Sequence, residues 1–259
     1  MTLVPGSVIT IGLLLPDVLG TYADRGNATV LARRLGWRGI PAEIVEVTAD
    51  RRAPTTCDIY VLGGGEDAAH SFATAWVHRS PGLVDALAAA QVVAVCAGFQ
   101  VLGRAVEAPD GRSLPGIGLV DAVTVPGRRR AVGEVVASCD APGVGLLTGF
   151  ENHRGRTRLG PAAAPLGRVR RGTGNGDGTD GALSPTLVAT YLHGPVLARN
   201  PALADLVLAR ATGVTELAPL EVQDEPAARA AHLSTPPEPG RLLGGGPVAT
   251  LLRRYRSDR

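Results

Sequence analysis

Short apolar segments recur through the first hundred residues of the chain, and segments with helical spacing separate them. We predict a buried strand at residues 10–15, further strands at residues 42–47, 57–62 and 92–96, of which 42–47 alternates apolar and polar positions, and helices at residues 27–35, 81–90 and 100–105. Strands that lack polar alternation and are joined by helices are typical of a parallel sheet covered on both faces. The pattern therefore predicts an open α/β fold, whose ligands bind at the carboxyl ends of the strands.

The second half of the chain has a different pattern. It predicts strands at residues 132–138 and 187–192 and a helix at residues 201–212. Residues 172–181 hold five glycines and no apolar side chain, so we expect a long loop there that contributes nothing to the core. From residue 219 prolines and glycines accumulate, although residues 247–255 have the pattern of a short amphipathic helix. We expect one domain over residues 1–215 and a partly irregular extension over residues 216–259.

Composition narrows the class of protein. The 259 residues are 45% hydrophobic, which is enough for one large core, and 26 basic residues nearly balance 24 acidic ones. With three Phe, two Trp and four Tyr, neither charge nor aromatic content favours binding to nucleic acid. No apolar run is long enough to span a membrane, and the N-terminus lacks the basic start of a signal peptide. Three scattered cysteines predict a protein of the reducing cytoplasm.

The segment around Cys96 carries the clearest chemistry. A buried strand runs into Cys96 and turns through Ala97 and Gly98 into a helix, which is the arrangement of a nucleophile elbow. The start of a helix places N–H groups and a positive dipole end near the sulfur, and both favour the thiolate. The alternative is a buried structural cysteine at the end of a strand.

Two further segments are expected at the same edge of the sheet. His193 follows the apolar run 187–192, so it can meet Cys96 and act as its base, although a histidine at a strand end is often structural. The glycines of residues 63–67 follow another strand and can direct N–H groups at a developing oxyanion. This loop lacks the Gly-Lys-Ser/Thr of a phosphate-binding loop, and a plain turn is the alternative.

These segments together resemble a known family. The elbow VCAGFQ is similar to the Cys-x-Gly-x-Gln elbow of class I (triad-type) glutamine amidotransferases, and the chain closely resembles their GatD subfamily, the glutaminase subunits of lipid II isoglutaminyl synthase, which is related to the CobB/CobQ-like amidotransferases. The matching segments are residues 22–40, 63–67, 95–103, 130–134, 149–160, 172–182 and 190–201. The resemblance spans roughly residues 10–215 and implies a flavodoxin-like, mostly parallel sheet with helices on both faces.

The resemblance also implies roles for single residues. Cys96 would be the nucleophile that attacks the side-chain amide of glutamine, and His193 its general base, which later protonates the departing ammonia. The Gly64 region and the N–H of Ala97 would form the oxyanion hole. Gln100 resembles the elbow glutamine that helps to hold the substrate.

The arginine triplet 128–130 is the expected site for the substrate carboxylate. Arg130 matches an arginine of the family, and its planar fork suits a carboxylate, but Arg128 and Arg129 are equally available, and a solvated basic run is the alternative. His153 is expected to be structural or to lie at a subunit contact, and a role as a second base is the less favoured interpretation.

The chain departs from the family pattern at one position. Many class I amidotransferases carry a Glu two residues after the histidine, whereas this chain has Pro195. We expect a carboxylate from a partner subunit to complete the triad, with Glu151 and Asp205 as alternatives within the chain.

The resemblance implies hydrolysis of L-glutamine to glutamate and ammonia through a thioester on Cys96. Ammonia would pass to a Mur-ligase-like synthetase subunit in a heterodimer. That subunit would bind ATP and Mg²⁺ and amidate the D-glutamate of the lipid II stem peptide. We expect no cofactor or metal in this chain, because its histidines and cysteines lack ligand spacing.

Three alternatives remain open. They are a cobyric-acid-synthase-like amidotransferase, another cysteine hydrolase of similar fold, and a non-catalytic binding subunit with a vestigial elbow. His70 and His78 are expected on a helical or loop surface, and Cys57 and Cys139 are expected to pack as small apolar residues.

Overall fold

A central six-stranded sheet organises the first lobe of the computed structural model, which describes residues 7–20, 24–108, 110–222, 230, 231 and 233. Its strand order is β11-β12-β4-β3-β1-β2, and every neighbouring pair is parallel except β11 with β12. The strands are β1 (Ile9–Leu14), β2 (Ala42–Val47), β3 (Ile59–Leu62), β4 (Gln91–Val95), β11 (Ala182–Ser184) and β12 (Leu187–Thr190). Strands β3 and β4 are buried along their whole length, as expected for a sheet covered on both faces.

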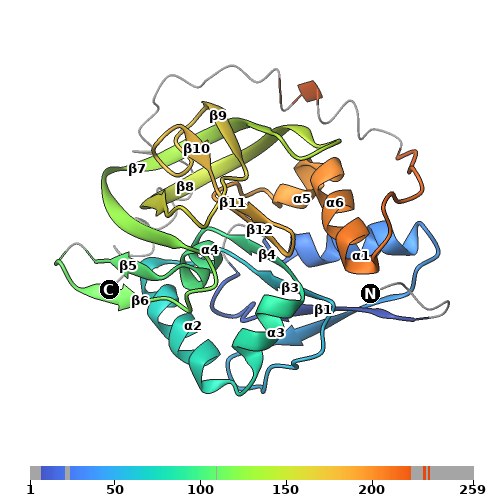
Figure 1. The fold of residues 1–259 in the computed structure, drawn as a ribbon, viewed down its shortest axis with the longest axis horizontal. Coiled ribbons are helices and arrows are strands. Elements are labelled where there is room, and N and C mark those ends of the chain that lie inside the picture. The colour runs from blue at the N-terminus through green and yellow to red at the C-terminus, as the bar shows by residue number, and fades with distance from the viewer. Residues whose placement is uncertain (1–6, 21–23, 109, 223–229, 232, 234–259) are drawn as a thin grey trace, which may run out of the picture.

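Helices cover the central sheet in two groups (Figure 1). One group comprises α1 (Gly26–Gly36), α5 (Val196–Arg199) and α6 (Pro201–Thr212), which contact one another. The other comprises α2 (Asp67–Arg79), α3 (Leu83–Ala89) and α4 (Ala97–Leu102), in which α2 contacts both α3 and α4. This arrangement confirms the predicted α/β class with helices on both faces of a mostly parallel sheet.

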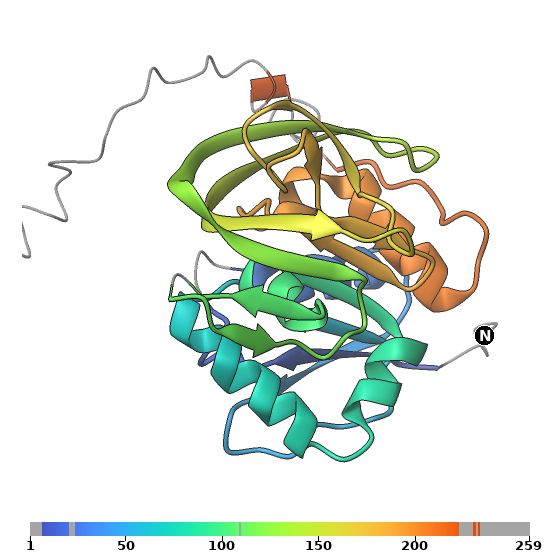
Figure 2. The ribbon, with the colours of Figure 1, turned by 60° about the vertical axis from the view of Figure 1, so that its left-hand side comes forward.

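A second sheet forms a separate layer on the central sheet (Figure 2). Its strands are β5 (Ala105–Glu107), β6 (Ser113–Pro115), β7 (Ala122–Cys139), β8 (Gly145–Leu159), β9 (Gly167–Arg171) and β10 (Thr179–Asp180). The long strands β7 and β8 pair antiparallel, with an irregularity between Pro126 and Ala131. Of this sheet we predicted only the strand at residues 132–138, which lies within β7. The other strands were missed because frequent glycines and arginines obscure the period-two pattern that normally indicates them.

Most predicted elements of the first lobe are present with shifted ends. The helix predicted at residues 201–212 is α6 with the same bounds. The helix predicted at residues 100–105 begins instead at Ala97 and ends at Leu102, because it starts directly at the elbow. Helix α2 was missed, and His70, which lies on it, is buried rather than on the surface as expected. Cys57 and Cys139 are buried free thiols, as predicted.

The glycine-rich segment 172–181 is not the peripheral loop that we expected. Asn175 and Asp180 are both buried, and the segment contains β10. The Asn175 side chain donates to the carbonyl of Gly181 at 2.9 Å and accepts from its N–H at 3.0 Å. Glycines with positive φ shape the backbone, and buried polar side chains replace apolar ones in holding it.

Two expectations concern the ends of the chain and membranes. The predicted helix at residues 247–255 lies outside the described residues, and residues 216–222 form no helix or strand. The division at residue 215 therefore stays a prediction. Among the described residues, no helix combines the length and hydrophobicity needed to cross a bilayer.

Candidate active site

Cys96 lies at a strained turn between β4 and α4. Its φ of 51° and ψ of −104° are conformations that an L-residue rarely adopts. The N–H of Cys96 donates to the carbonyl of Thr190 at 2.9 Å, which joins the elbow to the end of β12. Ala97 is the first residue of α4, so its N–H lacks an acceptor within the helix. The structure thus confirms the sharp strand-to-helix turn that the sequence predicts.

The elbow packs so closely on the loop after β3 that its glycine has no room for a side chain. A Cβ atom on Gly98 would lie 2.8 Å from both the Cβ and the carbonyl oxygen of Leu62. The N–H of Gly98 donates to the carbonyl of Gly63 at 3.1 Å. The loop of residues 63–65 and the elbow therefore lie side by side, as their positions at two strand ends predict.

His193 lies between the two sheets. It follows β12 of the central sheet, and its backbone forms two hydrogen bonds with Phe150 of β8, one of 2.8 Å and one of 3.1 Å. Its side chain is buried, and Cys96 is among the groups close enough to the imidazole to shift its pKa. The second sheet thus fixes the position of the imidazole from one side while the central sheet presents the sulfur from the other.

Asp24 orients the imidazole. Its Oδ2 accepts hydrogen bonds from Nδ1 of His193 and from the N–H of Gly64, each 2.9 Å long. Both side chains are buried, with 1% exposure for His193 and none for Asp24. Burial of His193 opposes its charged form, but the hydrogen bond with Asp24 and the interaction with Cys96 outweigh it and raise the pKa of His193 to about 9. The imidazole is therefore cationic at neutral pH.

Asp24 occupies the position for which we expected a carboxylate from a partner subunit, so that expectation is wrong for the acid beside Nδ1. The two alternatives within the chain are also wrong. Asp205 binds the guanidinium groups of Arg34 and Arg38. Glu151 accepts from the N–H groups of Thr173 and Gly174 and from His153 instead.

Pro195 explains how Asp24 reaches His193. A Cβ atom on Gly26 would lie 2.4 Å from Cγ of Pro195, so the chain after Asp24 packs directly on the chain after His193. The N–H of Leu197 donates to Oδ1 of Asn27 at 3.0 Å and holds the same two segments together. The residue that replaces the usual acid thus forms part of the contact that brings Asp24 to the imidazole.

Gln100 extends from α4 into a buried polar network. Its Nε2 donates to the hydroxyl of Tyr191 at 3.2 Å, and that hydroxyl shares a 2.6 Å hydrogen bond with Thr157. The ring of His153 stacks on Tyr191 at 3.9 Å, with Glu151 on the far side of His153 at 3.1 Å. Burial raises the pKa of Tyr191 to about 12, so the phenol stays neutral. Gln100 is therefore held with its amide nitrogen engaged.

The chain is similar to known proteins over most of its length. Residues 10–201 match the CobB/CobQ-like glutamine amidotransferase domain family. The chain belongs to this family. It is 34% identical over 208 residues to lipid II isoglutaminyl synthase (glutamine-hydrolyzing) subunit GatD of Staphylococcus aureus, which covers 78% of this chain and 84% of that protein. The GatD subunit of Streptococcus pneumoniae is 31% identical over 205 residues, covering 76% of this chain and 77% of that protein.

Solved structures agree with this amidotransferase assignment at the level of the fold. A crystal structure of a glutamine amidotransferase superimposes with a TM-score of 0.54 at 21% identity, covering 79% of this chain and 99% of the other. Cobyric acid synthase of Methylobacterium nodulans is 34% identical over 165 residues, but this amidotransferase spans only 32% of that protein.

Two predicted residues of this amidotransferase site stay predictions. Gly64 lies in the predicted oxyanion loop, but its N–H donates to Asp24, and a Cβ atom there would lie 2.6 Å from Cε1 of His193. Arg130 is exposed on β7. Its Nε donates to Oδ1 of Asn152, and its Nη2 donates to the backbone carbonyl of Asn152 at 3.2 Å. Asn152 lies two residues from Phe150, the backbone partner of His193.

Asp24 is the site residue of this amidotransferase that sequence reasoning missed. It lies in the segment 22–40 that resembles the family, yet 169 positions separate it from His193. The only local signal that distinguishes Asp24 from the other acidic residues is its position two residues before the start of α1 at Gly26.

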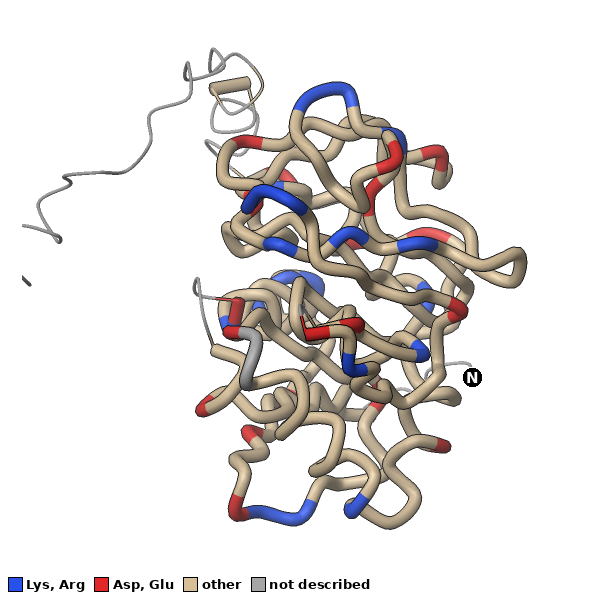
Figure 3. Tube along the Cα trace, turned by 90° about the vertical axis from the view of Figure 1, so that its left-hand side faces the viewer, with Lys and Arg blue, Asp and Glu red and all other residues tan. Residues whose placement is uncertain are grey.

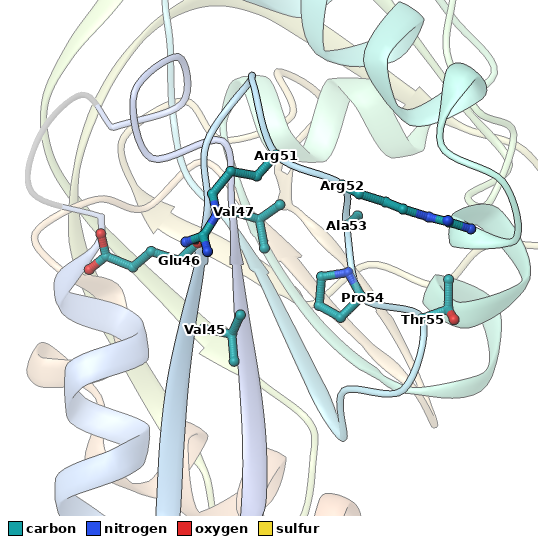
Figure 4. A pocket seen from close by; sticks show the side chains of 8 residues that line it. All are labelled: Val45, Glu46, Val47, Arg51, Arg52, Ala53, Pro54 and Thr55. Carbon is teal, nitrogen blue, oxygen red and sulfur yellow. The ribbon is translucent and has the colours of Figure 1, made fainter.

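A separate hollow is unrelated to the amidotransferase elbow. It has a volume of about 400 Å³ at the carboxyl end of β2 and is lined by residues 45–47 and 51–55 (Figure 4). Neither Cys96, His193 nor Gln100 lines it. Its position at the edge strand of the central sheet indicates no part in the chemistry of the elbow.

Proposed function

We propose that this chain is the glutamine-hydrolysing subunit of a lipid II isoglutaminyl synthase. The observation that carries the proposal is the buried row of Cys96, His193 and Asp24, in which Nδ1 of the imidazole bonds to the carboxylate and the neighbouring sulfur interacts with the imidazole. A cysteine at a strained elbow, a base and an orienting acid are the parts of a thiol-dependent acyl transfer. The identity with two GatD subunits narrows the acyl donor to glutamine.

In the first half of the reaction, the sulfur of Cys96 attacks the side-chain carbonyl carbon of L-glutamine as a thiolate, paired with the cationic imidazole of His193. The tetrahedral oxyanion receives a hydrogen bond from the N–H of Ala97, with the loop around Gly64 beside it. Collapse breaks the carbon–nitrogen bond, and His193 delivers its proton to the departing ammonia. The γ-glutamyl group is then held on Cys96 as a thioester.

In the second half, His193 takes a proton from water, whose oxygen attacks the thioester carbonyl. Collapse releases glutamate and restores the thiolate beside the imidazolium. Asp24 keeps Nδ1 protonated throughout, so that Nε2 faces the reacting atoms, and it stabilises the imidazolium before the attack and again after water has given up its proton.

Gln100 and Arg130 are the proposed contacts to the backbone groups of the substrate. Because Nε2 of Gln100 is engaged by Tyr191, its carbonyl oxygen can accept from the α-ammonium of glutamine. Arg130 is proposed to bind the α-carboxylate of glutamine. To do so, its guanidinium has to give up a hydrogen bond to Asn152 and form a pair of hydrogen bonds to the carboxylate.

Both GatD relatives are named as subunits of a synthase, which supports transfer of the ammonia to a second subunit. We propose a cytoplasmic heterodimer in which a Mur-ligase-like synthetase binds ATP and Mg²⁺ and amidates the D-glutamate α-carboxyl of the lipid II stem peptide. This chain would then reach lipid II only through that synthetase.

The test measures glutamate release from L-glutamine by the purified chain, with and without the synthetase. Cys96→Ala is the control for the nucleophile. The proposal expects release that disappears in Cys96→Ala, and amidation of lipid II only when synthetase, ATP and glutamine are all present. Absence of glutamate release under both conditions contradicts the proposal and favours a vestigial elbow.

A further inference from the structure

A second hollow, with a volume of about 890 Å³, lies where β7, β8 and the glycine-rich segment meet. Four arginines line it, namely Arg128, Arg129, Arg156 and Arg158, together with Val125, Pro126, Gly127, Thr157 and residues 175–177. We call it the arginine hollow. Its only acidic lining residue is Asp177, whose carboxylate accepts from the N–H and the hydroxyl of Thr179.

The positive charge of the arginine hollow has no carboxylate partner within the described part of the chain. None of its four arginines forms an ion pair there, whereas Arg34, Arg38 and Arg199 elsewhere all do. Arg128, Arg129 and Arg158 are exposed. A surface that gathers unpaired guanidinium groups favours a partner that carries the opposite charge.

Arg156 is built into the wall of the hollow. It donates to the carbonyl of Gly155 at 2.8 Å and to that of Arg129 at 3.1 Å, which ties β8 to the irregular part of β7. A Cβ atom on Gly176 would lie 2.2 Å from Cδ of Arg156, and one on Gly127 would lie 3.0 Å from its Cζ. Two glycines thus make room for this side chain, so its place is set before any partner binds.

The basic surface continues beyond the hollow. Arg154, Arg156 and Arg158 alternate along β8 and therefore point to one face of the strand, and Arg168 and Arg170 do the same on β9. Figure 3 shows the blue segments running across the lobe that β7, β8 and β9 form. A surface this extended exceeds what one phosphate or carboxylate group covers.

The hollow is also close to the candidate active site. Its lining residue Thr157 bonds at 2.6 Å to Tyr191, which accepts from Gln100 at 3.2 Å. The next residue of the arginine triplet, Arg130, bonds to Asn152 near His193. A protein that occupies this surface therefore lies beside the source of ammonia.

We propose that the arginine hollow and the adjoining arginines of β8 are the docking surface for an acidic segment of the synthetase subunit. This inference rests on the proposed function. Arginine is enriched in protein interfaces and bonds carboxylates in pairs, so several acidic side chains of one partner segment can be bound at once. The length of the surface favours a protein segment over a small phosphorylated ligand.

The experiment measures the affinity of the full chain for the purified synthetase by titration calorimetry, at about 0.05 M and about 0.3 M salt. The test variant is Arg128→Glu/Arg129→Glu/Arg158→Glu. The control is Arg33→Glu/Arg52→Glu/Arg79→Glu, which changes the net charge equally at three exposed arginines of the other lobe. A milder variant, with Gln at the same three test positions, covers the case in which charge reversal prevents folding.

We expect the test variant to bind about tenfold more weakly or worse, the control to stay within about twofold, and high salt to weaken the unchanged complex. Equal affinity of the test and control variants overturns the inference and leaves the glutaminase proposal intact. Titration of the unchanged chain with inorganic pyrophosphate is a further arm. Pyrophosphate binding that the test variant loses while it still binds the synthetase overturns the inference in favour of a small-anion site.

Glutamate release by the unchanged chain decides the proposed function separately. A chain that hydrolyses glutamine and binds the synthetase equally well with and without the three test substitutions overturns the docking inference alone. A chain that binds the synthetase through the arginine hollow but releases no glutamate overturns the glutaminase proposal alone.

Discussion

The carboxylate of Asp24 lies 2.9 Å from Nδ1 of His193, although 169 positions separate the two residues in the chain. The contact is buried on both sides and includes a second hydrogen bond, from the N–H of Gly64 to the same oxygen. Asp24 takes the place of the acid that the family often carries two residues after the histidine. The row of Cys96, His193 and Asp24 is thus assembled within one chain, from the elbow after β4, the end of β12 and the segment before α1.

Asp24→Asn tests this relationship. The amide can no longer stabilise an imidazolium, so we expect glutamate release to fall by roughly 10²- to 10⁴-fold. The pKa of His193 is raised to about 9, so the alkaline limb of the unchanged chain should lie near pH 9 and move to lower pH in the variant. The measurement is kcat/KM against pH.

Asp110→Asn is the matched control for that experiment, because Asp110 is exposed and its carboxylate bonds to Arg112, not to the elbow. Full activity of Asp24→Asn after addition of the synthetase would contradict the assignment. It would show instead that the partner supplies the acid.

Cys96→Gly and Cys96→Ala should both abolish activity but differ in stability. The φ of 51° at this position strains any residue with a Cβ atom, so Cys96→Gly is expected to be more stable than Cys96→Ala by about 1 kcal/mol. Urea denaturation of both variants measures the difference. At Ala88, an exposed position in α3, glycine should be less stable than alanine by about 1 kcal/mol. The same sign at both positions would argue against strain at the elbow.

Tyr191→Phe removes the acceptor that holds Nε2 of Gln100. We expect KM for glutamine to rise several-fold with a smaller change in kcat, and the free energy of unfolding to fall by about 1–2 kcal/mol. Tyr60→Phe is the matched control, because Tyr60 is equally buried and its hydroxyl donates to Pro54 at 2.9 Å, away from the elbow. It should lose stability but keep KM. Equal KM values in the two variants would remove Tyr191 from substrate positioning.

Asp180 should make stability fall as pH rises. Burial raises its pKa to about 7, well above that of an unfolded Asp, so the native state binds the extra proton between roughly pH 4 and pH 7. Its stabilising contribution is complete below that window and lost as pH rises through 7. Asp180→Asn cannot ionise, so its stability relative to the unchanged chain should improve from pH 5 to pH 8. Parallel urea-denaturation curves across this range would contradict the interpretation.

Gly64→Ala should disrupt the site without unfolding the chain. Its Cβ atom would lie 2.6 Å from Cε1 of His193 and 2.9 Å from Oδ2 of Asp24, so one of these groups has to move. We expect a loss of glutamate release of about tenfold or more, since small displacements of a catalytic group are costly. Gly36→Ala, where a Cβ atom meets nothing within 4 Å, is the control and should keep full activity.

The linear sequence determines the local parts of this protein. Four strands of the central sheet, the helix at residues 201–212 and the turn at Cys96 follow from apolar patterns and small residues that are close together in the chain. Cys96 and His193 could be paired in advance, because the carboxyl ends of parallel strands meet at one edge of a sheet. The family resemblance extended these predictions to Gln100 and the oxyanion loop.

Only the tertiary structure decides the rest. The acid is Asp24 because the packing of Pro195 on Gly26 brings two distant segments together, and no local pattern records such a contact. The glycine-rich segment is buried because Asn175 bonds to Gly181 within the segment and Asp180 accepts from the N–H of Tyr191 after β12. An apolar pattern, which was the signal used to predict buried segments, does not detect such bonds. The arginine hollow likewise arises from β7, β8 and a loop that meet only after folding. Sequence patterns specify which residues are buried or turned, whereas the partners of a buried polar group depend on long-range packing.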